Sequence, residues 1–131
     1  MVRLLLDTCT ALWYFAGDRC QIPERIRETL TDLDHDLYLS DVSILEISIK
    51  YRIGKLRLSG APSQTIPLWL ESHDIALLPL VTQAIFRLES LEDIHGDPFD
   101  RLLVAQAITH RMTIVTPDEH IAEYSAPVLW A

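Results

Sequence analysis

The sequence predicts an α/β protein in which helices cover both faces of a central, mostly parallel sheet, a three-layer α/β/α sandwich. Short apolar runs alternate along the chain with longer segments of helical periodicity. The short runs are almost continuously apolar, as expected for strands buried on both faces. With 131 residues and 49% hydrophobic content, the chain is predicted to form one domain over residues 1–131 with a single sizeable core.

In the first half of the chain, Val2-Arg3-Leu4-Leu5-Leu6 is the first strand candidate and ends at Asp7. Gly17 is expected to end the helix that follows. Further elements are predicted as helices over 8–16, 22–33 and about 42–52, and as a strand over 37–39. In the second of these helices, four apolar residues recur at helical spacing and are expected to form one buried face: Ile22, Ile26, Leu30 and Leu33.

The second half begins with a loop over residues 55–63 that contains Gly60 and Pro62. Helices are predicted over 64–72 and 81–88, and strands over 75–78 and 113–116. Residues 128–130 are predicted to form a last strand at an edge of the sheet.

The helix after Gly96 is predicted to begin with Asp97 as its N-cap and Pro98 at its first position. At helical spacing, Asp100 is continuous with the apolar residues Leu103 and Ala107. Its carboxylate is therefore expected to face inward, where it needs a partner. Both acids could also simply cap the helix and complement its dipole.

Composition and charge exclude some classes of protein. The net charge of −8 argues against a non-specific nucleic-acid coat protein, whose affinity comes from Lys and Arg. It does not exclude a nuclease that holds metal ions with acids. Cys9 and Cys20 form neither a disulfide framework nor a metal-ligand spacing, which favours a reducing compartment. Without a secretory signal or a membrane-spanning apolar run, the protein is expected to be soluble and cytoplasmic, with no membrane contact.

Four carboxylates are candidates for one site at the carboxyl ends of the strands, near the switch in strand order. Asp7 and Asp118 follow strands, whereas Glu46 and Asp100 lie on helices. Each acid alone could be a cap or an ion-pair partner, as Glu46 could be for Lys50. Together they would repel one another by about 1–3 kcal/mol per pair within about 6 Å, so a hard cation such as Mg²⁺ or Mn²⁺ is expected. The absence of a Cys/His ligand spacing argues against zinc.

Stretches of this sequence resemble the successive motifs of the PIN domain family, and most closely the VapC-like toxins of bacterial toxin–antitoxin pairs. The stretches span nearly the full chain: Leu4-Leu5-Leu6-Asp7-Thr8 with Leu12-Trp13, Leu45-Glu46-Ile47-Ser48-Ile49-Lys50 with Gly54-Lys55-Leu56, His95 to Ala107, and Val115-Thr116-Pro117-Asp118. The resemblance implies a metal-dependent endoribonuclease. Its acidic centre would correspond to Asp7, Glu46, Asp100 and Asp118, with Asp97 as an auxiliary acid.

Two positions depart from this pattern: Cys9 stands where close relatives often have His, and Leu45 where they often have Trp. Neither is one of the acids. Thr8 and Thr116 are candidate hydroxyls that support the acids. His95 is a candidate for orienting an acid. A basic stretch, Lys50, Arg52, Lys55 and Arg57, is either a solvated helix end or a rim that contacts RNA phosphates.

The resemblance also implies a homodimer and a small antitoxin that covers an apolar groove near the acids. Bulky apolar residues at 12–15 and 68–70 fit that expectation, although ordinary core packing could also accommodate them. A phosphatase or receiver domain fits poorly, because the acid and lysine positions that those sites need are not filled. The remaining alternative is a PIN-like binding scaffold without catalysis. The sequence does not identify the RNA.

Overall fold

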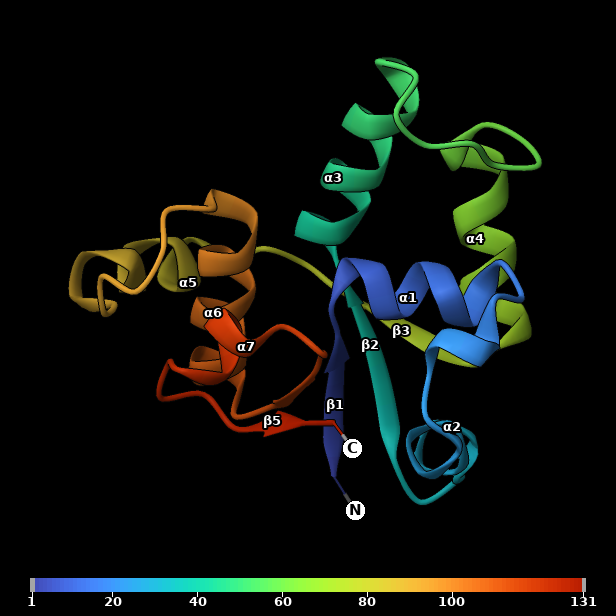
Figure 1. The fold of residues 1–131 in the computed structure, drawn as a ribbon. Helices are drawn as coiled ribbons and strands as arrows, with labels where there is room; N and C mark the ends of the chain where they lie inside the picture. The colour runs from blue at the N-terminus through green and yellow to red at the C-terminus, as the bar shows by residue number, and fades with distance from the viewer. Residues whose placement is uncertain (1, 131) are drawn as a thin grey trace.

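The computed structural model describes residues 2–130 and contains one sheet of five parallel strands in the order β3-β2-β1-β4-β5 (Figure 1). The predicted α/β sandwich with a mostly parallel sheet is confirmed. The strands are β1 (Arg3–Leu6), β2 (Asp36–Ser40), β3 (Ile75–Leu78), β4 (Thr113–Val115) and β5 (Val128–Leu129).

Helices lie on both faces of the sheet (Figure 1). On one side are α1 (Thr8–Phe15), α2 (Glu24–Thr31) and α4 (Pro62–Ser72), and on the other are α5 (Thr82–Phe86), α6 (Pro98–His110) and α7 (Glu119–Ala122). Helix α3 (Asp41–Arg52) follows β2 directly and extends past the carboxyl ends of the strands. No helix within residues 2–130 is long and apolar enough to span a membrane.

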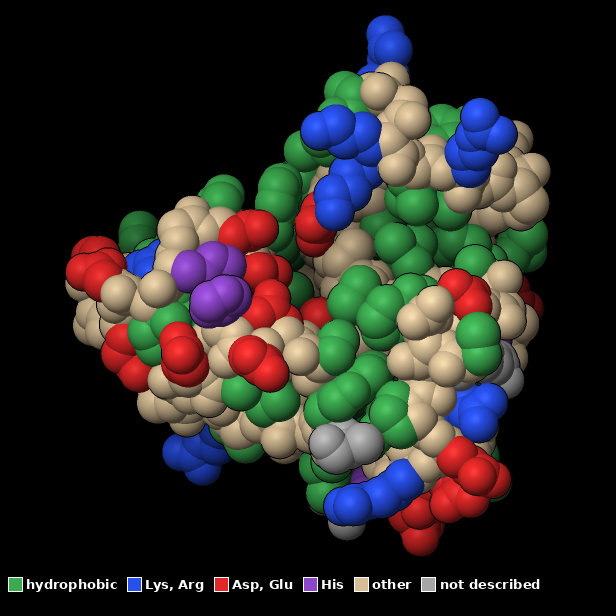
Figure 2. Space-filling view, viewed as in Figure 1, with side chains coloured by type: hydrophobic (Ala, Val, Ile, Leu, Met, Phe, Trp, Pro, Cys, Tyr) green, Lys and Arg blue, Asp and Glu red, His purple; other side chains and the backbone are tan. Residues whose placement is uncertain are grey.

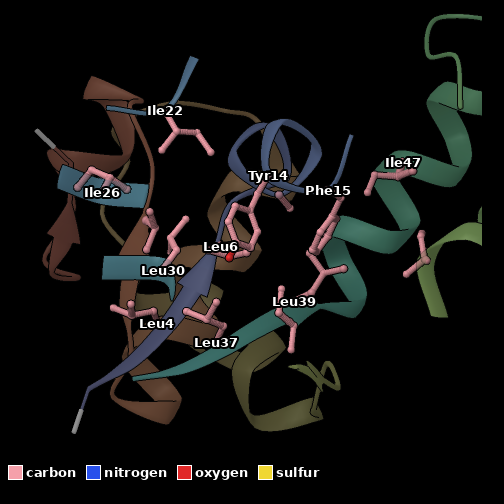
Figure 3. Close-up of a cluster of buried hydrophobic side chains, with 14 residues drawn as sticks. Leu4, Leu6, Tyr14, Phe15, Ile22, Ile26, Leu30, Leu37, Leu39 and Ile47 are labelled. Carbon is pink, nitrogen blue, oxygen red and sulfur yellow. The ribbon is translucent and has the colours of Figure 1, made fainter. Parts of the chain in front are cut away.

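The side chains of β1 alternate between two hydrophobic clusters, as the period of a strand requires. Leu4 and Leu6 pack with residues of α1 and α2 in the first cluster (Figure 3), whereas Leu5 packs with residues of α6 in the second. All three leucines are at most 1% exposed. The central strand is therefore buried on both faces, which explains its continuous apolar sequence.

The order of the strands reverses at β1. The chain passes from β1 to β2 and β3 on one side, and then returns to add β4 and β5 on the other. The register pairs Leu6 with Val115, and the backbone N–H of Asp7 donates to the carbonyl of Val115 at 3.2 Å. Asp7 and Thr116 are thus neighbours just beyond the strand ends, at the switch point where ligands bind in such sheets.

Several sequence expectations need correction. The helix predicted over 22–33 is shorter in the structure. Helix α2 ends at Thr31, and a 3₁₀ turn over Arg19–Gln21 precedes it. Leu33, expected on the buried face, is 94% exposed. Asp32 accepts a hydrogen bond from the backbone N–H of Asp34 at 2.9 Å, a turn that competes with continuation of the helix.

The helix predicted over 81–88 is also divided, into α5 and a 3₁₀ turn over Arg87–Ser90. Of the bulky residues offered as evidence for a partner, Tyr14 and Phe15 are buried. The Phe15 ring stacks on Trp69 with centroids 5.0 Å apart. Leu68 remains 64% exposed. Core packing therefore accounts for part of that apolar set.

Candidate active site

Asp7 lies at the centre of the candidate site, between the end of β1 and the start of α1. One carboxylate oxygen accepts the backbone N–H of Thr10 at 2.9 Å and thereby caps α1. The other accepts the Thr116 hydroxyl at 2.5 Å. The residue is only 5% exposed, and this burial raises the pKa of Asp7 although the bonds from Thr10 and Thr116 act in the opposite direction.

Thr116 connects Asp7 to Asp118. Its hydroxyl donates to Asp7 and accepts the backbone N–H of Asp118 at 3.0 Å. The carboxylate of Asp118 in turn caps α7 through the N–H of His120 at 2.8 Å. A single buried hydroxyl therefore positions acids that are 111 residues apart in sequence on adjacent strand ends.

The start of α6 carries two more acids, and the predicted cap is confirmed. Asp97 Oδ1 accepts the N–H groups of Phe99 at 2.9 Å and Asp100 at 3.3 Å, and Pro98 occupies the first position. Asp100 is half-buried within the site. Its pKa is raised to about 6, first by burial and then by the charges of Asp97 and Asp118, while His95 acts in the opposite direction. Glu46 contributes a smaller upward effect on this pKa.

Glu46 belongs to α3 and connects it to α1. Its Oε1 accepts the Thr8 hydroxyl at 2.7 Å, and Thr8 Oγ1 also lies 3.0 Å from Ser43 Oγ. The other oxygen, Oε2, lies 3.0 Å from Lys50 Nζ, the ion pair considered from sequence. Lys50, one helical turn away, therefore offsets the negative charge of Glu46.

The structure adds a histidine to this group. Atoms of His95, Asp100 and Asp118 that could serve as metal ligands all lie within 4.8 Å of one another. The sequence predicted His95 only as a residue that orients an acid, from its position before α6, and not as a metal ligand. The fold brings its ring to Asp100, with Nε2 3.3 Å from Oδ2.

The Cys9 thiol lies beside Asp7, with Sγ 3.5 and 3.4 Å from the two carboxylate oxygens. Burial, with the adjacent Asp7 charge, raises the pKa of Cys9 to about 12. The side chain is therefore a neutral thiol at physiological pH. It supplies Asp7 with a weak hydrogen-bond donor and no further negative charge.

Figure 2 shows acidic side chains gathered beside the notch between α3 and the α6 side of the molecule, with histidines next to them. Lys and Arg side chains lie across the notch, over α3 and the loop that follows it (Figure 2). The four residues of the basic stretch are all exposed: Lys50, Arg52, Lys55 and Arg57. A cavity of about 580 Å³ lies elsewhere, between α2 and the start of β2 and β3, and contains none of the predicted site residues.

The donor set suits a hard divalent cation. Carboxylate oxygens predominate, and such ligands are preferred by Mg²⁺ and Mn²⁺. The pKa of Asp100 is raised first by burial and then by the negative charges of Asp97 and Asp118, so a cation beside this carboxylate would be stabilised. The residues present therefore fit a metal-binding acidic site at the switch point of a parallel α/β sheet.

These features define an α/β protein with an acidic site at the carboxyl ends of parallel strands. The model of the PIN domain family matches residues 4–127, and the chain belongs to that family. No curated protein matches the chain in sequence.

Solved structures share the fold at low sequence identity. VapBC2 from Rickettsia felis, bound to a DNA fragment from its promoter, matches with a TM-score of 0.74 and 14% identity, over 99% of this chain and 100% of that chain. DNA-bound VapBC from Salmonella typhimurium matches with a TM-score of 0.68 and 19% identity, over 98% of each chain. FitAcB from Neisseria gonorrhoeae matches with a TM-score of 0.64 and 20% identity, over 96% of each chain.

Replacing Thr116 with Val is expected to lower the free energy of unfolding by about 1–3 kcal/mol, because it removes a buried hydroxyl that bonds to both Asp7 and the Asp118 backbone. Thr116→Ser keeps the hydroxyl and should retain more of this stability. Urea unfolding of the two variants measures the difference. Equal stability of the Val and Ser variants would show that the hydroxyl bridge contributes nothing.

Replacing Asp100 with Asn is expected to stabilise the metal-free protein near neutral pH by an amount on the order of 2 kcal/mol. In the folded protein the pKa of Asp100 is about 6, above its ordinary value of 3.8, so stability is lost as the pH rises through this range and the carboxylate ionises first in the unfolded state. As the pH falls from 7 towards 4, the wild type binds this proton and most of the difference disappears. Thermal unfolding of the wild type and Asp100→Asn in EDTA, at pH 7.5 and at pH 4, measures this difference in stability. A gain that is the same at both pH values would contradict the assignment.

Proposed function

We propose that this protein is a metal-dependent endoribonuclease and the toxin of a type II toxin–antitoxin pair. The observation that carries the proposal is the convergence of Asp7, Asp100 and Asp118 at the strand switch point of a PIN domain, with crowded negative charge at Asp100. A structural role alone does not explain why Asp100, which caps no helix, lies among other acids.

Asp7, Glu46, Asp100 and Asp118 are the residues that would hold Mg²⁺ or Mn²⁺. When bound, such a cation lowers the pKa of a coordinated water and stabilises negative charge on the scissile phosphate. Asp97 caps α6 and adds to the negative potential around Asp100 as an auxiliary acid. The thiol of Cys9 stays protonated and is not a nucleophile in this proposal.

Two threonines hold two of the acids in place in the absence of substrate. Thr116 holds one oxygen of Asp7, and Thr8 holds one oxygen of Glu46. Each acid keeps lone pairs for a cation while its rotation is restricted, which lowers the cost of organising the site. Ser43, beside Thr8, extends this arrangement into α3.

The basic stretch Lys50, Arg52, Lys55 and Arg57 is proposed to contact the RNA backbone. It lies on the end of α3 and the following loop, across the notch from the acids (Figure 2). Positive charge there offsets the repulsion between a polyanionic substrate and a chain of net charge −8. These contacts are with phosphates and so would not select a sequence.

An antitoxin and a second copy of the chain are the proposed protein partners. The similar structures from Rickettsia felis and Salmonella typhimurium are VapBC structures. In this chain, α3 and the residue after it expose apolar side chains, and α4 exposes one more: Leu45, Ile49, Ile53 and Leu68. An apolar surface beside an acidic site suits a small antitoxin segment that covers both.

The function is tested by inducing the protein in bacterial cells with and without the product of any small adjacent gene, and sequencing RNA 5′ ends. Growth arrest with discrete cleavage sites, relieved by the neighbouring product, is the expected result. An induced, folded protein that produces no cuts and no arrest would instead favour the non-catalytic scaffold.

A further inference from the structure

We propose that His95 is a positioning residue for Asp100, with its ring proton on Nε2 directed at the Asp100 carboxylate, and is not itself a metal ligand. The proximity of His95, Asp100 and Asp118 would by itself allow either role. The hydrogen bonds around the ring distinguish between them. The inference rests on the proposed function only for the role of Asp100 as a ligand.

The first step concerns Nδ1. The backbone N–H of Asp97 donates to His95 Nδ1 at 3.2 Å, so Nδ1 must present a lone pair. In a neutral imidazole one nitrogen carries the proton and the other accepts. The proton of His95 is therefore on Nε2, and the tautomer is assigned by the start of α6.

The second step concerns Nε2. This nitrogen is buried, and it makes no hydrogen bond of good geometry to any residue in the described part of the chain. Asp100 Oδ2 is 3.3 Å away, within ion-pair distance but poorly aligned. Contacts of this kind are often long before ligands bind and shorten in the working complex. An N–H on Nε2 would then be satisfied by one oxygen of Asp100, leaving the other oxygen for a cation.

The backbone of His95 is also held in place by hydrogen bonds, and two aromatic rings lie beside its imidazole. The Tyr124 hydroxyl accepts the backbone N–H of His95 and donates to its carbonyl, both at 3.2 Å. Arg101 donates to the carbonyl of Glu92 at 2.8 Å and lies 3.2 Å from the Tyr124 hydroxyl. The rings of His120 and Tyr124 lie with centroids 5.4 and 6.4 Å from that of His95. Arg101 and Tyr124 thus fix the loop that presents the imidazole to Asp100.

The alternative role conflicts with these contacts. A ligating Nε2 must lose its proton, which would then sit on Nδ1 and face the N–H of Asp97, placing two donors against each other. A nitrogen ligand would also shift the site towards zinc and other imidazole-binding metals. With His95 as a donor to Asp100, the metal ligands from this chain are carboxylate oxygens alone.

The tautomer is measured directly by ¹⁵N NMR of the wild-type protein labelled at histidine, without metal and after addition of Mg²⁺ or Zn²⁺. The expected result is protonated Nε2 and unprotonated Nδ1 for His95 in every sample. A proton on Nδ1, or loss of the Nε2 proton when Zn²⁺ is added, overturns the proposal. This readout does not depend on cleavage of any RNA.

A matched pair of variants tests the function of that proton. The side-chain amide of His95→Gln can replace the Nε2 donor, whereas His95→Asn is too short to reach Asp100. Mn²⁺ affinity is expected to fall about 10- to 100-fold in the Asn variant, the range seen when a residue that orients a ligand is lost, and only a few-fold in the Gln variant. Circular dichroism checks that both variants are folded.

Equal affinities in wild type and both variants, or equal losses in both variants, would overturn the proposal. Cleavage is measured separately in the same samples. If the wild type binds Mn²⁺ but cuts no RNA, the proposed function fails, while the comparison of Gln and Asn still decides the role of His95.

Discussion

Asp7→Asn is expected to reduce RNA cleavage by more than about 100-fold, beyond the loss typical of residues that only orient a ligand. The substitution keeps the shape of the side chain, so Asn can still accept the Thr10 N–H that caps α1. It removes the negative charge that a cation requires. Because burial raises the pKa of Asp7, the ionised group is costly in the metal-free fold, and the variant should be at least as stable as the wild type.

Asp36→Asn provides the matched control for Asp7→Asn. Asp36 is exposed at the start of β2, the opposite end of the sheet from the acids, and the change in charge is the same. Single-turnover cleavage of a labelled RNA by the two variants and the wild type gives the comparison. If the folded Asp7→Asn protein cuts RNA at the wild-type rate, with contaminating nuclease excluded, the acids serve only as helix caps and ion-pair partners.

Removing divalent metal is expected to abolish cleavage by the wild type, and adding Mn²⁺ in excess of the chelator should restore it. Carboxylates alone would repel the scissile phosphate, so without a cation they provide no means of stabilising charge on it. The measurement is the cleavage rate in EDTA, then after Mn²⁺ or Mg²⁺ is added, with Asp7→Asn carried through the same series. Undiminished cleavage in excess EDTA would exclude the metal-ion mechanism.

Much of the fold could be predicted from local chemistry. The start of α6 follows from Asp97 and Pro98, whose side chains suit the cap and the first position, and the structure has both there. The continuous apolar sequence of β1 predicted a strand buried on both faces. The predicted end of the second helix, Leu33, was wrong. Apolar periodicity extends to Leu33, but the turn formed by Asp32 ends α2 before it.

The candidate site was predictable as a set of residues but not as an arrangement. Strand ends and helix faces predicted the four acids as candidates, whereas the Thr116 bridge depends on the register of β1 against β4, which no local pattern specifies. His95 joins the acids only because Arg101 and Tyr124 shape the loop before α6. Whether Glu46 is free or paired depends on the Lys50 rotamer, and the structure pairs them.

The central claim is that these acids form a cation-binding centre. Calorimetric titration of metal-free wild-type protein with Mn²⁺ tests it most directly, with Asp100→Asn as the variant and Asp36→Asn as the control. We expect saturable binding in the wild type and in Asp36→Asn, and a loss of binding in folded Asp100→Asn. Absence of Mn²⁺ binding by the wild type, or unchanged affinity in Asp100→Asn, would contradict the account.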